Sequence, residues 1–277
     1  MSPDQYCQDR AAKSGSSFYY SFLFLPPDKR RAITALYAFC REVDDVVDEG
    51  LDPEVARMKL AWWRTEIGSV FSGGAQHPVA RALVAVTRQF HLPESGFNDI
   101  IDGMEMDLTR NRYADFDELE TYCYRVAGVV GLMAAEIFGY RDRQTLSYAK
   151  NLGTAFQLTN IIRDVGEDAL RNRIYLPLDE LARFGVSPEQ VLHPDANTDL
   201  RELIAFQIDR ARQYYARAFD ALPAEDRRAQ RPGLVMAAIY LKLLDRIEGD
   251  GCRVLERRVS LSPIRKLWIA WTTWMRG

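Results

Sequence analysis

Two sets of carboxylates recur at helical spacing along this chain. In the segment ALYAFCREVDDVVDEG, Asp44 and Asp48 follow Tyr37 and Arg41 at steps of three and four residues. The segment GTAFQLTNIIRDVGED carries the second set, which comprises Gln157, Asn160, Asp164 and Asp168. Such steps place the members of each set on one side of an α-helix, about one turn apart. Each set is therefore expected to form a polar stripe that faces one direction.

Stability does not explain these stripes. Aspartate is a poor helix former, and like charges one turn apart oppose each other by about 0.2–0.5 kcal/mol per pair. A bound divalent metal would offset both effects, and Mg²⁺ is usually held by one or two carboxylates together with substrate phosphates. We predict a site for two or three Mg²⁺ ions that a diphosphate bridges. Its predicted ligands are Asp44, Asp48, Asn160, Asp164 and Asp168.

Two arginines, Arg41 and Arg163, stand beside these carboxylates. A planar guanidinium can grip phosphate oxygens with two parallel hydrogen bonds. Metal ions and arginines together would neutralise the charge that builds on a departing diphosphate. The competing interpretation is a solvated helix face, which is common for one acidic run. Two runs, each with an arginine neighbour and apolar flanks, favour the metal site.

Aromatic residues near both stripes could line a dry chamber. Departure of diphosphate from an allylic carbon leaves a carbocation that must be kept from water, and aromatic faces attract cations. The candidates are Phe18, Tyr19, Phe22, Tyr37, Phe39, Tyr122, Tyr124, Phe156 and Tyr240. As a group they are also explained by core packing, although Tyr37 lies on the acidic stripe. Gly128 and Gly131 indicate either room for a long ligand or close helix packing.

Composition narrows the class of protein. The 277 residues can bury a large core, and the apolar and charged fractions of 47% and 27% are those of an ordinary globular protein. A net charge of −3 gives no sign of a nucleic-acid partner. The four cysteines form no CxxC pair, which argues against a zinc site or a disulfide framework and favours the cytoplasm. The apolar stretch SFYYSFLFLPP is too short to span a bilayer and does not read as a signal peptide.

Helical periodicity extends over most of the chain. Apolar residues at three- and four-residue steps predict helices over 28–49, 53–72, 76–90, 94–110, 115–139, 142–165, 199–221 and 231–256. The irregular stretch 169–198 should carry a short helix at about 179–184 and fold back onto the bundle. No alternating run predicts a sheet, and no Walker or GxGxxG motif follows a strand. We predict an all-α fold with one domain over residues 1–277.

The chain resembles the squalene/phytoene synthase family of head-to-head prenyltransferases from about Ser14 to Arg258. The stretches that carry the resemblance are SFYYSFLFLP, ALYAFCREVDDVVDE, GMEMDL, YCYRVAGVVG, QLTNIIRDVGED, RIYLP and AAIYLKLLDRI. The resemblance implies an isoprenoid-synthase helical bundle around a central cavity. It also implies that the enzyme uses Mg²⁺ to join two prenyl diphosphates.

The resemblance assigns roles to individual residues. The stripe carboxylates and Asn160 match the two metal-binding motifs. Positions that contact the diphosphate or the ionising allyl group are matched by Tyr37, Arg41, Gln157 and Arg163. Tyr122 and Tyr240 match aromatic positions near the reacting carbons, and Arg257 or Arg258 matches a basic C-terminal position, with Arg257 taken as the substrate contact. Where some relatives carry His and Lys, this chain has Ser14, Gly15, Ser16 and Ser17, so Ser14 and Ser17 are the expected phosphate contacts.

Three further acidic residues are expected to act less directly. Asp45 lies off the first stripe, so it should support that stripe rather than bind metal. Asp102 and Asp107, in IIDGMEMDL, recur in the family pattern and are expected to anchor the structure.

Within the family, the N-terminal motif and the ending ERRVSLSPIRKLWIAW look most like bacterial hopanoid-associated presqualene diphosphate synthases. We therefore expect two molecules of farnesyl diphosphate to condense to presqualene diphosphate. The alternatives are a phytoene synthase that uses geranylgeranyl diphosphate and a full squalene synthase that also uses NADPH, a cofactor we do not expect here. A non-enzymatic assembly factor is disfavoured because both aspartate motifs are intact.

The C-terminal segment 264–277 suggests contact with a membrane. It contains Trp268, Trp271 and Trp274, and its basic residues are Arg265, Lys266 and Arg276. Tryptophan with basic residues suits a helix that lies in the membrane interface. The alternative is a terminal helix packed on the bundle. A peripheral location on the inner face of the cytoplasmic membrane would let the enzyme exchange its lipophilic substrate and product with the lipid bilayer.

Overall fold

The computed structural model describes residues 1–276 except 14–20, 23, 49, 51 and 195–197. Within these ranges every named element is a helix, which confirms the all-α prediction. The elements are α1 (Pro3–Lys13), α3 (Pro27–Asp48), α4 (Pro53–Ser72), α5 (Pro78–Phe90), α6 (Glu94–Thr109), α7 (Phe116–Cys123), the π-helical turn η1 (Tyr124–Gly128), α8 (Val129–Phe138), α9 (Gln144–Leu170), α10 (Leu178–Arg183), α11 (Pro188–Leu192), α12 (Arg201–Ala221), α13 (Arg231–Gly249) and α14 (Pro263–Arg276).

Most helix starts follow the local signals in the sequence. The side chain of Asp52 accepts a hydrogen bond from the backbone N–H of Glu54, and Pro53 occupies the first turn of α4. Two predicted helix ends were wrong. Helix α9 continues to Leu170, five residues beyond the predicted end, and α13 stops at Gly249 because Gly251 adopts a φ of 74°.

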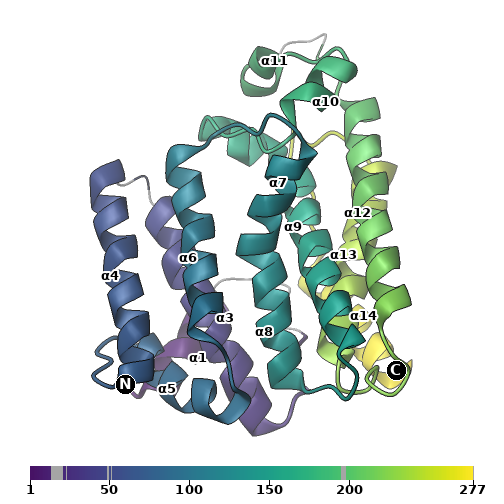
Figure 1. The fold of residues 1–277 in the computed structure, drawn as a ribbon. Coiled ribbons are helices and arrows are strands. Elements are labelled where there is room, and N and C mark those ends of the chain that lie inside the picture. Colours follow the sequence, from purple (N-terminus) through teal and green to yellow (C-terminus); the bar gives the residue numbers. More distant parts are fainter. Residues whose placement is uncertain (14–20, 23, 49, 51, 195–197, 277) are drawn as a thin grey trace.

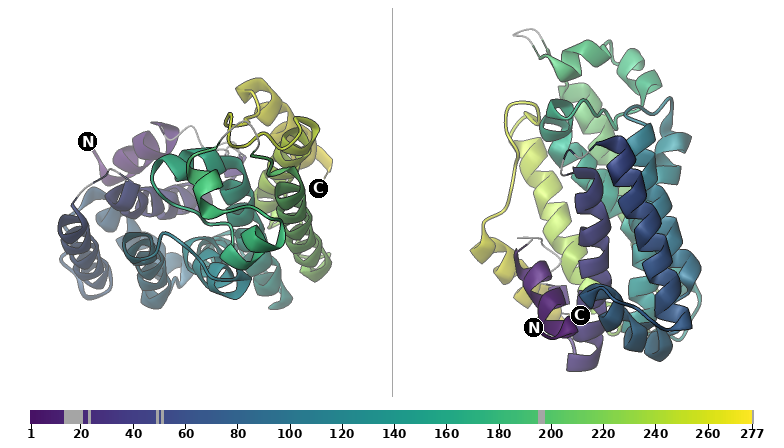
Figure 2. Two further views of the ribbon diagram at one scale, coloured as in Figure 1. Left: turned by 90° about the horizontal axis from the view of Figure 1, so that it is seen from above. Right: turned by 90° about the vertical axis from the view of Figure 1, so that its left-hand side faces the viewer.

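The long helices run side by side, with α10 and α11 at one end of the molecule and α1, α5 and α14 towards the other (Figure 1). Buried side chains form two groups. One group joins α1, α3, α4, α5, α6 and α8, and the other joins α7, α9, α12, α13 and α14 with the 174–192 segment. The view from above in Figure 2 shows the N-terminal helices on one side of the molecule and the C-terminal helices on the other.

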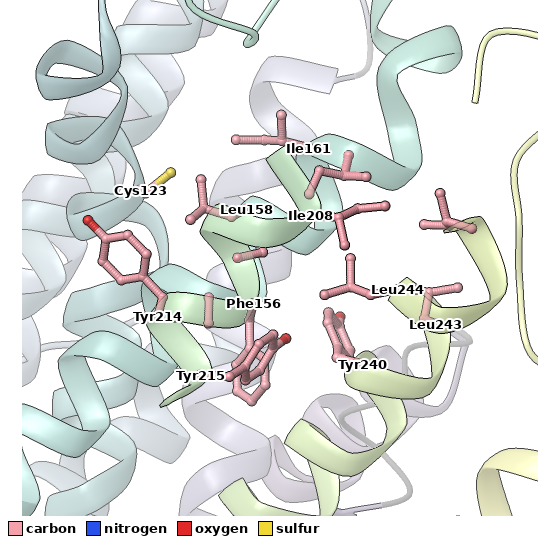
Figure 3. Close-up of a cluster of buried hydrophobic side chains, with 14 of the residues drawn as sticks. Cys123, Phe156, Leu158, Ile161, Ile208, Tyr214, Tyr215, Tyr240, Leu243 and Leu244 are labelled. Carbon is pink, nitrogen blue, oxygen red and sulfur yellow. The ribbon is translucent and has the colours of Figure 1, made fainter. Parts of the chain in front are cut away.

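Aromatic and aliphatic side chains hold α9 against α12 and α13 (Figure 3). The ring of Phe156 on α9 lies 5.1 Å from that of Tyr240 on α13 and 6.0 Å from that of Tyr215 on α12. Fully burying an aliphatic or Phe side chain contributes about 1.5–3 kcal/mol. This cluster therefore fixes the helix that carries the second carboxylate stripe.

Glycines let α9 approach the η1–α8 segment very closely. A methyl group added at Gly131 would lie 2.3 Å from the carbonyl oxygen of Ala149, and one at Gly153 would lie 2.3 Å from that of Ala127. Only a residue without a side chain fits at either position. Close helix packing, rather than room for a ligand alone, thus explains Gly131.

The part of the stretch 169–198 that the structure describes folds back onto the bundle, as predicted. The backbone N–H of Ile174 donates to the carbonyl of Asn111, and that of Leu178 donates to the carbonyl of Tyr113. These bonds lay the segment after α9 along the loop between α6 and α7. Among the helices that the structure describes, none combines the length and the apolar character needed to cross a membrane.

Candidate active site

A cavity of about 500 Å³ lies between the two halves of the molecule. Its walls come from α3, α6, η1, α8 and α9, with the start of α13 closing one side. One end is acidic, because the C-terminal halves of α3 and α9 supply the stripe carboxylates. The other end is mainly apolar and is lined by Phe22, Ile33, Ala134, Phe138, Tyr148 and Pro232, among others.

The structure brings both predicted stripes to this one cavity. From α3 the lining residues include Tyr37, Arg41, Asp44 and Asp48, and from α9 they include Gln157, Asn160, Asp164 and Asp168. On α9, the Asn160 amide nitrogen lies 3.4 Å from the Gln157 amide oxygen. Because α3 and α9 line the same cavity, their two stripes meet at its acidic end, which we call the mouth.

Arginines neutralise most of the carboxylates at this mouth. Arg41 donates to Asp44 and to Asp45, and Arg163 donates to Asp164 through Nε at 2.7 Å. Asp45 also accepts a hydrogen bond from Arg10 of α1, so it supports Arg41, as the sequence suggested. In the parts of the chain that the structure describes, no three Asp, Glu, His or Cys side chains converge closely enough to form a metal site by themselves.

The donor set nonetheless fits divalent cations. Burial, together with the neighbouring Asp48 and Asp107, raises the pKa of Asp44 to about 7 against the opposing effect of Arg41. Burial and Asp164 likewise raise the pKa of Asp168 to about 7. Burial therefore disfavours the charged form of these carboxylates unless a cation binds, and hard oxygen donors of this kind are the ligands that Mg²⁺ prefers.

Sequence reasoning missed a basic and aromatic group that follows α9. Arg173 donates to Asp48 at 2.8 Å, and Tyr175 donates to Asp107 at 2.7 Å. Both residues line the cavity, as does Arg171. The signal was the stretch RNRIYLP, of which the family resemblance quoted only RIYLP and assigned no roles. Its two arginines reach the mouth because the segment folds back beside the loop after α6.

Asp107 is part of the cavity, whereas Asp102 is not among its lining residues. Asp107 accepts hydrogen bonds from the hydroxyls of Tyr122 and Tyr175, and burial raises its pKa to about 6. Asp102 instead pairs with Arg64 of α4 at 2.5 Å. The anchoring role expected for both residues thus describes Asp102, while Asp107 belongs to the polar mouth.

The structure places the two candidates for the C-terminal basic position differently. Arg257 pairs with Asp250, away from the mouth, and lines a smaller neighbouring pocket. Arg258 lines the main cavity and donates through Nε to Asp164 at 2.8 Å. The two side chains are adjacent in sequence, and the turn after α13 decides which of them points towards α9.

The aromatic candidates divide between the cavity and the core. The residues that line the cavity are Phe22, Tyr37, Tyr122 and Phe156. Phe39 is fully buried against Trp63 and Phe97, so it belongs to the core. Tyr240 stands behind the lining and donates to the Asn160 amide oxygen at 3.2 Å. Burial raises the pKa of Tyr240, so its hydroxyl acts as a donor. Ser14, Ser17, Phe18 and Tyr19 lie outside the described residues.

This site defines a class of enzyme. An apolar chamber beneath facing carboxylates and arginines suits a substrate with an anionic head group and a long apolar tail. Comparison with known proteins agrees: residues 11–265 match the model of the squalene/phytoene synthase family. The chain belongs to the squalene/phytoene synthase family. It is therefore a prenyltransferase-type enzyme of isoprenoid biosynthesis, in a family that acts on isoprenyl diphosphates and uses divalent metal.

Individual relatives refine the comparison. The chain is 39% identical to a phytoene synthase of Arthrospira platensis, over 94% of this chain and 89% of the relative. It is 38% identical to a 15-cis-phytoene synthase of Synechocystis sp., over 98% and 84%. The crystal structure of a dehydrosqualene synthase superposes with a TM-score of 0.86 at 30% identity, over 99% of this chain and 96% of that one. This likeness confirms the isoprenoid-synthase helical fold.

The expected reaction was wrong. We had expected farnesyl diphosphate to be converted to presqualene diphosphate for hopanoid synthesis. Relatives at 34–39% identity are instead named phytoene synthases, which favours the alternative. Both reactions use the same fold and the same carboxylate motifs. The quoted motifs therefore specify the family and do not specify the length of the prenyl tail.

Proposed function

We propose that this enzyme is a phytoene synthase that condenses two molecules of geranylgeranyl diphosphate head to head. The observation that carries the proposal is a single cavity with an acidic, arginine-rich mouth and a long apolar interior. The identity to phytoene synthases over nearly the whole chain supports the choice of the longer tail.

The dimensions of the cavity suit a long prenyl tail. Along α9, sixteen residues separate Asp164 at the mouth from Tyr148 near the far end, both of which line the cavity. At about 1.5 Å of rise per residue, this distance is about 24 Å. A geranylgeranyl tail is one five-carbon unit longer than a farnesyl tail, so it fills more of the length of the cavity.

The mouth supplies the groups needed for release of diphosphate. Asp44, Asp48, Asn160, Asp164 and Asp168 would hold two or three Mg²⁺ ions, which as Lewis acids stabilise negative charge on the leaving group. Arginines of the mouth exchange their carboxylate partners for phosphate oxygens, because a guanidinium binds either anion with the same fork. In this way the ion pairs keep the mouth neutral until substrate and metal arrive together.

The interior protects the allylic cation that remains. Tyr37 lines the cavity one helical turn before Arg41, where an aromatic ring can attract a cation. Phe156 and Gly153 continue the wall below it. Water reaching this region would quench the cation to an alcohol, so a closely packed apolar wall favours carbon–carbon bond formation over hydrolysis.

Product analysis tests the proposal. Purified enzyme with Mg²⁺ should convert geranylgeranyl diphosphate to phytoene faster than it converts farnesyl diphosphate to any product, as judged by mass spectrometry. Asp44→Asn and Asp164→Asn should each lower turnover by about 100-fold or more. The control is Asp209→Asn, at a carboxylate of α12 that is 70% exposed. Turnover of farnesyl diphosphate alone would refute the assigned substrate, and full activity of either cavity variant would refute the metal ligands.

A further inference from the structure

Helix α14 exposes an apolar stripe to solvent. The side chains in this stripe occur at steps of three and four residues, and they are Ile264, Leu267, Trp268, Trp271 and Met275. Their exposed fractions range from 47% to 82%. They account for five of the twelve large exposed hydrophobic residues in the described part of the chain. Exposed apolar side chains are therefore denser on α14, with five in 14 residues, than on α4, where Val55, Met58, Trp62 and Phe71 are spread over 20 residues.

The opposite face of α14 is held firmly. Ala270 is fully buried, and the Trp274 ring lies 5.2 Å from that of Phe24. The guanidinium of Arg231, the first residue of α13, stands 5.7 Å from the centre of the same ring. Because these contacts fix the helix in place, the apolar stripe has a defined orientation and points away from the bundle.

The helix lies beside the apolar end of the cavity. Its contacts Phe24 and Arg231 are close neighbours in sequence of Phe22 and Pro232, which line that end. In Figure 1, α14 lies towards the end of the bundle opposite α10 and α11, and the right-hand view of Figure 2 agrees. The acidic mouth lies along the C-terminal halves of α3 and α9, towards the end of the bundle that carries α10 and α11. The start of α14 approaches it, since burial and the charges of Arg163 and Arg258 lower the pKa of Lys266.

The chemistry of the stripe favours lipid as its partner. Helix α14 has the sequence PIRKLWIAWTTWMR, which contains basic residues and no acidic residue. Tryptophans beside basic residues suit a helix that lies in the interface of an anionic membrane, with its apolar face about 5–10 Å deep. A stable protein interface buries about 800 Å² per partner, which is more than five side chains of one helix expose.

We propose that α14 docks in the plane of an anionic lipid bilayer and brings the apolar end of the cavity to the membrane surface. The inference rests in part on the proposed function, because its benefit is the transfer of a long hydrocarbon product. With α14 in the interface, a product leaves the apolar end into lipid, while the acidic mouth stays in water for the diphosphate.

Vesicle flotation of the full chain tests the proposal. Wild-type protein should float with vesicles of phosphatidylcholine and phosphatidylglycerol, and less with phosphatidylcholine alone. The double variant Trp268→Ser/Trp271→Ser should lower the partition coefficient at least tenfold. Trp62→Ser is the matched control, since Trp62 is an exposed tryptophan of α4 and its loss should leave flotation unchanged. Ile264→Glu is a second variant, which should also lower flotation. Since this side chain is 82% exposed, the substitution should not disturb folding.

The outcomes separate this proposal from the assigned reaction. Activity measured in detergent micelles should be the same for the wild type and the α14 variants. Flotation that is equal for wild type and variants would overturn membrane docking. A concentration-dependent dimer that these substitutions abolish, with no binding to vesicles, would also overturn it and would assign the stripe to a second copy. Normal flotation by an enzyme that makes no phytoene would refute the proposed function alone.

Discussion

The substitution Gly153→Ala should separate α9 from the segment that it touches most closely. A methyl group at this position would lie 2.3 Å from the Ala127 carbonyl oxygen, 2.8 Å from the Ala127 carbonyl carbon and 2.9 Å from the Gly128 Cα. A carbon–oxygen contact normally needs about 3.3–3.6 Å. All three atoms belong to backbone that cannot rotate away, so the two elements must move apart by about 1 Å.

The size of the effect follows from this displacement. Overpacking of a closed interface costs about 1–3 kcal/mol, and the upper value applies where only backbone can yield. The higher helix propensity of alanine offsets about 1 kcal/mol of this loss in stability. The net loss is about 2 kcal/mol, or about 4–8 °C in Tm for a domain of this size. Gln157 and Asn160 lie one and two turns further along α9, and a shift of about 1 Å in catalytic geometry costs about 100-fold in turnover.

Urea unfolding and steady-state turnover measure the two effects together. The matched control is Gly68→Ala in α4, where the nearest atom to the new methyl group is the Glu94 carboxylate oxygen at 3.8 Å. This control should gain about 1 kcal/mol and keep full activity. If Gly153→Ala were as stable and as active as the wild type, the close approach would not constrain the site and the reasoning would fail.

Three further predictions concern the cavity. Ala134→Phe, in the apolar wall of α8, should lower kcat/KM for geranylgeranyl diphosphate by about 10-fold relative to farnesyl diphosphate; an equal loss for both would contradict a role of this wall in tail length. Tyr175→Phe removes a 2.7 Å donor to half-buried Asp107 and should lower the free energy of unfolding by about 1–3 kcal/mol in urea, so unchanged stability would count against that bond. Because burial raises the pKa of both Asp44 and Asp168 to about 7, these carboxyls bind protons more readily in the folded chain than in the unfolded chain. Metal-free enzyme should therefore lose stability as pH rises from about 4 to about 7, and Mg²⁺ should restore it above pH 7. The Asp44→Asn/Asp168→Asn variant should lack this part of the pH dependence, and an unchanged profile would refute the assignment.

Local spacing determined the helices and the residues on each polar stripe. The 3.6-residue period relates Asp44 to Asp48 and Asp164 to Asp168 whatever surrounds them. The same local information indicated the family, because its motifs lie within single helices. Errors at helix ends, such as the continuation of α9 to Leu170, arose where the periodic pattern gave no clear stop.

Contacts between distant segments could not be read from the sequence. Arg173 meets Asp48 across more than a hundred residues, and Arg258 rather than Arg257 reaches Asp164 because of the turn that follows α13. The role of Gly131 likewise became clear only from the carbonyl that faces it.

Sequence alone thus determined which side chains share a helical face, since that depends on the geometry of one element. Only the tertiary structure decided which faces meet, which arginine neutralises which carboxylate, and which end of the chamber is apolar. These properties depend on how helices far apart in the chain pack against one another, and no local period encodes that packing.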